Sequence, residues 1–259
     1  MSELMPIERN PVTSPINTEE VKKALATHGV YRADEVDFGN DPHAFVLALG
    51  RQLGPVVPQY GEEVLELVPR RDAKQNGPFG YDAFPLHTDA LFKKDGRTPD
   101  AIIMLCMHPG EGGEHLLVNG HAVIAELQRT SRIDIDALLA LEIAFCHKGE
   151  TVEDAADVFV LPVAPPQEEA GHLYRGPIYN ISDARLRYAT TLMNRIHNDF
   201  NEVSQAMEQS ASPLQNVQTG SLWITDNKRI LHGRKKILSP ERKMLRVHLK
   251  LAGTHLSTP

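Results

Sequence analysis

Two histidine–acid triplets in the sequence have the spacing of metal ligands, and their surroundings distinguish them. His87-Thr88-Asp89 follows the short apolar run Phe84-Pro85-Leu86, whereas His197-Asn198-Asp199 lies in a stretch with helical spacing. Side chains two residues apart point to the same side of a strand but about 200° apart on a helix. We therefore expect His87 and Asp89 to converge on one point, and His197 and Asp199 to be two surface positions.

A third metal ligand has to come from elsewhere in the chain, and His232 is the best candidate. It ends the strand-like run Arg229-Ile230-Leu231, and Gly233 after it leaves room for a close approach. Two histidines and one carboxylate with open coordination positions suit non-haem Fe(II). Taken alone, a histidine in the position of His232 is more often structural. Asp226 and Asn227, just upstream, either support His232 or simply form a turn.

The last predicted strand, residues 242–251, carries basic side chains on one face. Its odd positions are apolar from Leu245 to Leu251, while Arg242, Arg246 and His248 occupy the other face. One interpretation is a half-buried strand whose basic face lies in water. The other places Arg242 and Arg246 in a polar interior, where the planar guanidinium group binds carboxylates through two parallel hydrogen bonds.

Together these residues resemble the taurine dioxygenase and clavaminate synthase-like family of Fe(II)/2-oxoglutarate-dependent oxygenases. The resemblance also covers residues 84–89, the segment Pro109-Gly-Glu-Gly-Gly113, and Leu53-Gly54-Pro55 at the end of a predicted helix, and so spans most of residues 28–251. It implies a mainly β fold with flanking helices (α+β), built on a double-stranded β-helix (jelly-roll, cupin-like) core. It also implies Fe(II), 2-oxoglutarate and O2 as cofactor and co-substrates, with succinate and CO2 as co-products.

The resemblance assigns roles to individual residues. It implies that His87, Asp89 and His232 bind the iron and that Arg242 pairs with the distal carboxylate of 2-oxoglutarate. Arg246 matches a second arginine, which helps to hold the co-substrate or an acid group of the substrate. Because Asp89 is present where halogenating members have a small residue, hydroxylation or desaturation is expected rather than halogenation.

One position departs from the family pattern. Where the family has a threonine or serine after the Gly-Gly-acid sequence, this chain has His115 in Gly112-Gly-Glu-His115. An imidazole could donate a hydrogen bond to the co-substrate in place of the hydroxyl group. An ordinary strand histidine is the alternative.

The substrate is less determined than the metal site. Arg246 and Arg175 could meet an acidic group, and Tyr81, Phe84 and Tyr179 could form an apolar wall. We expect hydroxylation of an unactivated C–H bond in a small acidic molecule, such as an amino-acid derivative or a natural-product intermediate. The alternatives are a desaturase or cyclase acting on an apolar natural-product intermediate, a non-redox metalloenzyme, and a small-acid binding protein on the same fold.

The elements that must position these residues are mostly predicted strands. Asp41-Pro42 predicts the start of a helix that Gly54 ends, and Asn17 predicts the start of a shorter helix over 20–27. Strands are expected at 64–68, 101–107, 116–118, 143–147, 158–163, 173–178, 221–225, 230–233 and 242–251, and helices at 121–130, 134–141 and 183–209. This pattern is typical of a β barrel or sandwich with helices outside it. We expect a single domain over residues 1–259, with residues 1–16 as an extended arm.

Composition narrows the class of protein. With 27 basic and 34 acidic residues the net charge is -7, which argues against a nucleic-acid or anionic-membrane binder. No apolar run approaches the roughly 20 residues that cross a bilayer. Cys106 and Cys146 sit in apolar segments and form no CxxC pair, which indicates buried thiols in a reducing compartment, with one disulfide between them as the alternative. We therefore expect a cytoplasmic enzyme that acts on a small-molecule substrate. A homo-oligomer is compatible with the sequence.

Overall fold

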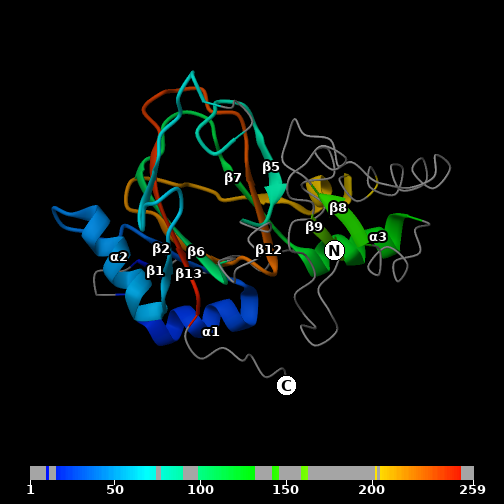
Figure 1. Ribbon diagram of the computed structural model, residues 1–259, viewed down its shortest axis with the longest axis horizontal. Coiled ribbons are helices and arrows are strands. Elements are labelled where there is room, and N and C mark those ends of the chain that lie inside the picture. Colours follow the sequence, from blue (N-terminus) through cyan, green and yellow to red (C-terminus); the bar gives the residue numbers. More distant parts are fainter. Residues whose placement is uncertain are drawn as a thin grey trace.

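The computed structural model describes residues 10–11, 16–73, 77–89, 99–131, 142–145, 159–162, 202 and 205–251. Within this part of the chain, two sheets face each other and helices cover the outside (Figure 1). The prediction of a mainly β fold with flanking helices and a jelly-roll type core is confirmed. The described strands form a sandwich rather than a closed barrel.

The larger sheet has seven strands and is antiparallel except at one edge. Its order is β1 (Asn10–Pro11), β2 (Val30–Asp34), β11 (Leu222–Asp226), β6 (Ala101–His108), β13 (Lys243–Leu249) and β3 (Val56–Val57), with β4 (Leu65–Leu67) also paired to β13. The smaller, four-stranded sheet has the order β10 (Ser212–Pro213), β7 (His115–Asn119), β12 (Ile230–Arg234) and β5 (Phe84–His87). A separate two-stranded antiparallel sheet pairs β8 (Glu142–Phe145) with β9 (Phe159–Pro162).

Three helices flank these sheets in the described residues. Helix α1 (Thr18–His28) and helix α2 (Pro42–Leu53) pack on the outer face of the larger sheet, and α3 (Gly120–Thr130) follows β7 (Figure 1). Both predicted helix starts are correct: the side chains of Asn17 and Asp41 accept hydrogen bonds from the first-turn amides of α1 and α2. None of the described helices is long and apolar enough to span a membrane.

Alternation along the central strands separates the core from the site. In β6, Ile103 and Leu105 face the helices, whereas Ile102 and Met104 face the smaller sheet. Strand β13 follows the same rule, since Leu245, Val247 and Leu249 belong to the helix-side core. Its other face, which carries the basic residues, is therefore directed between the two sheets.

Most predicted strands agree with the structure to within a few residues, but some elements were missed or cannot be compared. The short strands β1, β3 and β10, and β2 with its buried Arg32, were not predicted. The predicted strand at 173–178, the predicted helix at 134–141 and most of the predicted helix at 183–209 lie outside the described residues.

Candidate metal centre and co-substrate pocket

His87, Asp89 and His232 come together because β5 and β12 are antiparallel neighbours. His232 pairs directly with His87 in the register of these strands, and their ring centroids lie 4.4 Å apart. Asp89 follows two residues after His87, and its Oδ1 lies 3.2 Å from His87 Nε2. One ligand atom from each of the three residues fits within a mutual distance of 4.8 Å. Two ligands at right angles on a metal, with bonds of about 2.1 Å, lie about 3 Å apart, so the cluster can hold one ion.

The imidazole of His232 has the properties of a metal ligand. Both of its ring nitrogens are buried and have no hydrogen-bond partner among the described residues. The Asp89 carboxylate is 3.7 Å from His232 Nε2, which is beyond hydrogen-bonding distance. Burial, together with the neighbouring His87, lowers the pKa of His232, so the ring is neutral and offers a lone pair. A buried polar atom without a partner is costly, and a bound metal would remove that cost.

Asp89 is kept ionised by donors from the other sheet. Burial alone would raise its pKa, but the charge of Arg246, together with the neighbouring histidines, holds the pKa of Asp89 well below its usual range. Arg246 Nη1 donates to Asp89 Oδ2 at 2.7 Å, and His248 Nε2 donates to the same oxygen at 2.8 Å. Burial lowers the pKa of His248 to about 4, so this imidazole is neutral. Gln59 Oε1 accepts from Arg246 Nε at 2.7 Å and fixes the guanidinium group from behind.

Asn227 positions the backbone of Asp89. Its Oδ1 accepts from the Asp89 amide at 2.8 Å, and its Nδ2 donates to the carbonyls of Asp89 at 3.1 Å and Pro99 at 3.0 Å. Asp226 instead accepts a hydrogen bond from the Lys228 amide and forms an ion pair with Arg229, so it stabilises a turn. Of the two residues considered as support for His232, neither forms a hydrogen bond with its ring; Asn227 instead supports Asp89.

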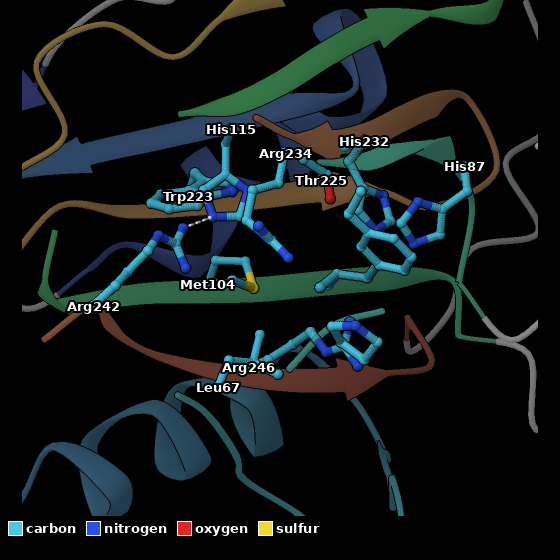
Figure 2. A pocket seen from close by; sticks show the side chains of 14 residues that line it. Leu67, His87, Met104, His115, Trp223, Thr225, His232, Arg234, Arg242 and Arg246 are labelled. Carbon is cyan, nitrogen blue, oxygen red and sulfur yellow. Dashed lines mark hydrogen bonds between the residues drawn. The ribbon is translucent and has the colours of Figure 1, made fainter. Parts of the chain in front are cut away.

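A pocket of about 530 Å³, including the open space at its mouth, extends from this cluster between the two sheets. Figure 2 shows His87 and His232 at one end of the pocket, and Arg242 with His115 at the other. Arg242 Nη2 lies 2.6 Å from His115 Nε2. Burial, and then the charge of Arg242, lower the pKa of His115 well below its usual range. The neutral ring therefore accepts from Arg242 through Nε2, and its proton is on Nδ1.

Arg242 is a buried cation without a carboxylate partner among the described residues. Burial lowers its pKa to about 10, so it remains charged at neutral pH. Gly113 allows the guanidinium group to lie where it does: its φ is +70°, and a Cβ there would come within 2.9 Å of Arg242 Nε. The glycine-rich segment noted in the sequence thus packs against the predicted co-substrate arginine.

Two polar residues of the pocket lining, Arg234 and Thr225, were missed by the sequence analysis. Arg234 is buried, and its guanidinium donates to the carbonyls of Gly77, Gly80, Asp82 and Lys235. Thr225 on β11 directs its hydroxyl group into the pocket (Figure 2). The Thr225 position could have been found, because alternation places Trp223 and Thr225 on the same face of β11. No local signal distinguishes Arg234 from a surface arginine.

The predicted substrate residues fall into three groups. Phe84 lines the pocket, with its ring centroid 4.3 Å from that of His87. Tyr81 is half-buried in the loop before β5, outside the described lining of this pocket. Arg175 and Tyr179 lie outside the described residues. Arg246 lines the pocket while also pairing with Asp89.

The sequence matches a known family over nearly its whole length. Residues 5–248 match the Taurine catabolism dioxygenase TauD, TfdA family. The chain belongs to this family. It is therefore an Fe(II)- and 2-oxoglutarate-dependent dioxygenase, as the sequence predicted. No curated protein sequence matches it significantly.

Solved structures with the same fold share little sequence with this dioxygenase. Asparagine oxygenase in complex with Fe(II), (2S,3S)-3-hydroxyasparagine and succinate is 17% identical, with a TM-score of 0.65 over 90% of this chain and 78% of that chain. The non-haem iron oxygenase OrfP, in complex with Fe, succinate and (3S)-hydroxy-L-Arg, is 15% identical, with a TM-score of 0.67 over 90% and 80%. PvcB from Pseudomonas aeruginosa is 16% identical, with a TM-score of 0.67 over 91% and 80%.

Proposed function

We propose that this dioxygenase hydroxylates an unactivated C–H bond of a small acidic substrate, such as an amino-acid derivative or a natural-product intermediate. In this proposal His87, Asp89 and His232 hold Fe(II), and Arg242 binds the distal carboxylate of 2-oxoglutarate. The observation that carries it is the two-ended pocket. One end has an unpartnered buried imidazole within a ligand cluster, and the other has a buried guanidinium with no carboxylate partner in the described residues.

The iron and 2-oxoglutarate, when bound, supply the oxidising chemistry and yield succinate and CO2. The chain supplies orientation and exclusion of water. His87 and Asp89 would supply two ligands to the iron, and His232 would supply a third from the neighbouring strand. Three protein ligands leave positions for a chelating co-substrate and O2. Asp89 as a carboxylate ligand favours hydroxylation or desaturation over halogenation.

His115 and Thr225 are proposed to complete the co-substrate end. His115 holds Arg242 by accepting through Nε2, which leaves its Nδ1–H as a donor for a carboxylate oxygen. This supports the expectation that an imidazole replaces the usual threonine or serine. The Thr225 hydroxyl, which faces the same pocket, offers a second donor.

The substrate class is supported by two kinds of observation. Asparagine oxygenase and OrfP, which share the fold, are solved with hydroxylated amino acids. In this chain, Arg246 lines the pocket beside the metal cluster and can meet an acid group, while Phe84 forms an apolar wall. Arg246 already pairs with Asp89, so a substrate acid would share this cation rather than take it over.

Desaturation or cyclisation of an apolar natural-product intermediate is the second candidate. Leu67, Ile102, Met104 and Trp223 give the pocket a largely apolar lining. PvcB, which has the same fold, is an oxygenase from an isonitrile synthetic pathway.

Succinate release tests the proposal directly. Purified protein with Fe(II), 2-oxoglutarate and O2 should release succinate, and a panel of amino acids, their derivatives and apolar intermediates should accelerate it. Product mass separates hydroxylation (one added oxygen atom) from desaturation (two hydrogen atoms lost). If Asp89→Ala released succinate as fast as the native protein, the metal assignment would be wrong.

A further inference from the structure

We propose that His248 is a positioning residue for the metal ligand Asp89, acting with Arg246 to restrict this carboxylate to coordination through one oxygen. The inference rests on the proposed function in one respect, because it takes Asp89 as a ligand of the iron. It goes beyond that function by assigning a role to a histidine that is neither in the ligand cluster nor among the residues lining the pocket.

The geometry at Asp89 is specific. Arg246 Nη1 and His248 Nε2 both donate to Oδ2, at 2.7 and 2.8 Å. Each carboxylate oxygen has two lone pairs in the carboxylate plane, so two donors satisfy Oδ2. Oδ1 receives neither of these bonds; its partner is His87 Nε2 at 3.2 Å, a member of the same ligand cluster, and a metal bound between the two groups would replace that contact. Oδ1 is therefore the oxygen left to bind a metal.

This restriction has a chemical consequence for the co-substrate. A carboxylate free to rotate can bind a metal through both oxygens and occupy an additional coordination position. That position is needed here, because 2-oxoglutarate and O2 must enter beside three protein ligands. Donors on Oδ2 prevent the second contact and fix the direction of Oδ1. Hydrogen bonds to ligating groups are known to tune both metal affinity and ligand orientation.

His248 suits this role because of its position. It stands on the site-facing side of β13, two residues after Arg246, so both donors reach the same oxygen from one strand. Its side chain is buried and held within the fold. Arg246 already pairs with the Asp89 carboxylate, and His248 adds the second donor to the same oxygen.

The test compares three substitutions on β13. His248→Leu removes the donor, and His248→Gln keeps a donor at the reach of Nε2. Met244→Leu is the matched control, because Met244 is buried on the same face of β13 and is not a hydrogen-bond partner of Asp89. Each metal-free protein is titrated with Co(II) under nitrogen, and its visible d–d absorption is recorded. That absorption reports the number and geometry of the ligands. Thermal unfolding of the metal-free proteins is measured in parallel.

We expect His248→Leu to bind Co(II) about 10- to 100-fold more weakly than the native protein, the range seen when hydrogen-bond partners of metal ligands are removed. His248→Gln should stay within about threefold of the native affinity and keep the native absorption spectrum. Met244→Leu should change neither. A purely structural role for His248 would instead lower thermal stability in His248→Leu and leave Co(II) affinity and the spectrum unchanged, which would overturn the inference.

Two further outcomes are decisive. If His248→Leu does not fold, His248→Asn replaces it, because its amide is too short to reach Oδ2; equal Co(II) affinities for the Gln and Asn variants would then refute the role. If the native protein does not bind Co(II), or Asp89→Ala binds it equally well, the proposed metal site itself fails and this inference fails with it. Native-like binding by His248→Leu, alongside lost binding by Asp89→Ala, rejects only the positioning role.

Discussion

Two buried arginines of the pocket should respond to the same substitution in opposite directions. Arg242 and Arg234 are 4% and 5% exposed, and burial lowers the pKa of each to about 10. Their hydrogen bonds differ. Arg234 donates to four backbone carbonyls, whereas Arg242 has one partner, the ring of His115, among the described residues. We infer that Arg234 stabilises the fold and that Arg242 is available to bind an anion.

The magnitudes follow from these contacts. A pKa lowered to about 10 corresponds to about 3 kcal/mol of destabilisation at neutral pH. Arg242→Met removes this cost, keeps most of the aliphatic stem and loses one charge-assisted hydrogen bond worth about 1.5 kcal/mol. The metal-free protein should therefore gain about 1–2 kcal/mol, or about 2–8 °C in Tm. Arg234→Met removes the same cost but breaks four charge-assisted bonds of at least about 1.5 kcal/mol each, so it should lose about 3 kcal/mol or more.

The affinity for 2-oxoglutarate should respond in the opposite order: Arg242→Met should weaken it strongly and Arg234→Met only slightly. Losing the cation that pairs with a buried carboxylate costs about 2–5 kcal/mol, so Arg242→Met should weaken 2-oxoglutarate binding by about 30- to 4,000-fold. Arg234→Met should change it by less than about tenfold, because its donors already have partners. Thermal unfolding of the metal-free proteins, and anaerobic titration of the Fe(II)-loaded proteins with 2-oxoglutarate, measure both effects. A lower Tm for Arg242→Met, or unchanged 2-oxoglutarate affinity, would refute the reasoning.

Three further predictions concern the metal end of the pocket. Co(II) at about 100 times its Kd should stabilise the native protein by about 2.7 kcal/mol, or about 5–11 °C in Tm, and Asp89→Ala should abolish that shift in a thermal scan. Asn227→Ala leaves the amide and carbonyl of Asp89 without their side-chain partner, so urea unfolding should show a loss of about 1–3 kcal/mol and Co(II) affinity should fall; unchanged affinity would contradict the positioning of Asp89 by Asn227. Finally, the pKa of His248 is lowered to about 4 in the folded protein, whereas the ordinary pKa of histidine is about 6.5. Between these two pH values His248 binds a proton in the unfolded chain but not in the folded chain, so the unfolded state is favoured as the pH falls. The metal-free protein should therefore lose about 2 kcal/mol from this group between pH 7 and pH 5, His115 adds a loss in the same direction, and urea unfolding of His248→Gln should show a shallower pH dependence.

Alternation along the strands made the candidate site predictable from sequence. His87 and Asp89 were placed together because a spacing of two is a same-side spacing only in an extended segment. The basic face of residues 242–251 was recognised in the same way, and the structure buries Arg242 and Arg246 between the sheets, as the less ordinary of the two interpretations required. Period and spacing are local properties, so a single sequence records them.

Contacts that depend on the register between distant strands were not predictable. Asn227 reaches the backbone of Asp89 across 138 residues of sequence, and Arg234 reaches the carbonyl of Asp82 across 152. A polar residue at a turn looks the same whether its amide faces water or another loop. Strand β2 was missed for a related reason. Arg32 and Asp34 interrupt its apolar pattern, and their mutual ion pair at 2.8 Å shows why they are tolerated there.

The two sheets contribute different parts of the site, and the Asp89 side chain connects them. The two histidines of the cluster stand on β5 and β12 of the smaller sheet. Asp89 follows β5, yet its carboxylate is held by Arg246 and His248 of β13, in the larger sheet. Its backbone is held by Asn227, which directly follows β11 of the larger sheet. A metal bound by all three ligands would therefore connect a carboxylate fixed by one sheet to imidazoles fixed by the other. Because Arg242 also adjoins β13, the same packing between sheets would set the distance from such a metal to Arg242, and with the roles proposed above the geometry of the reaction would depend on how the two sheets pack.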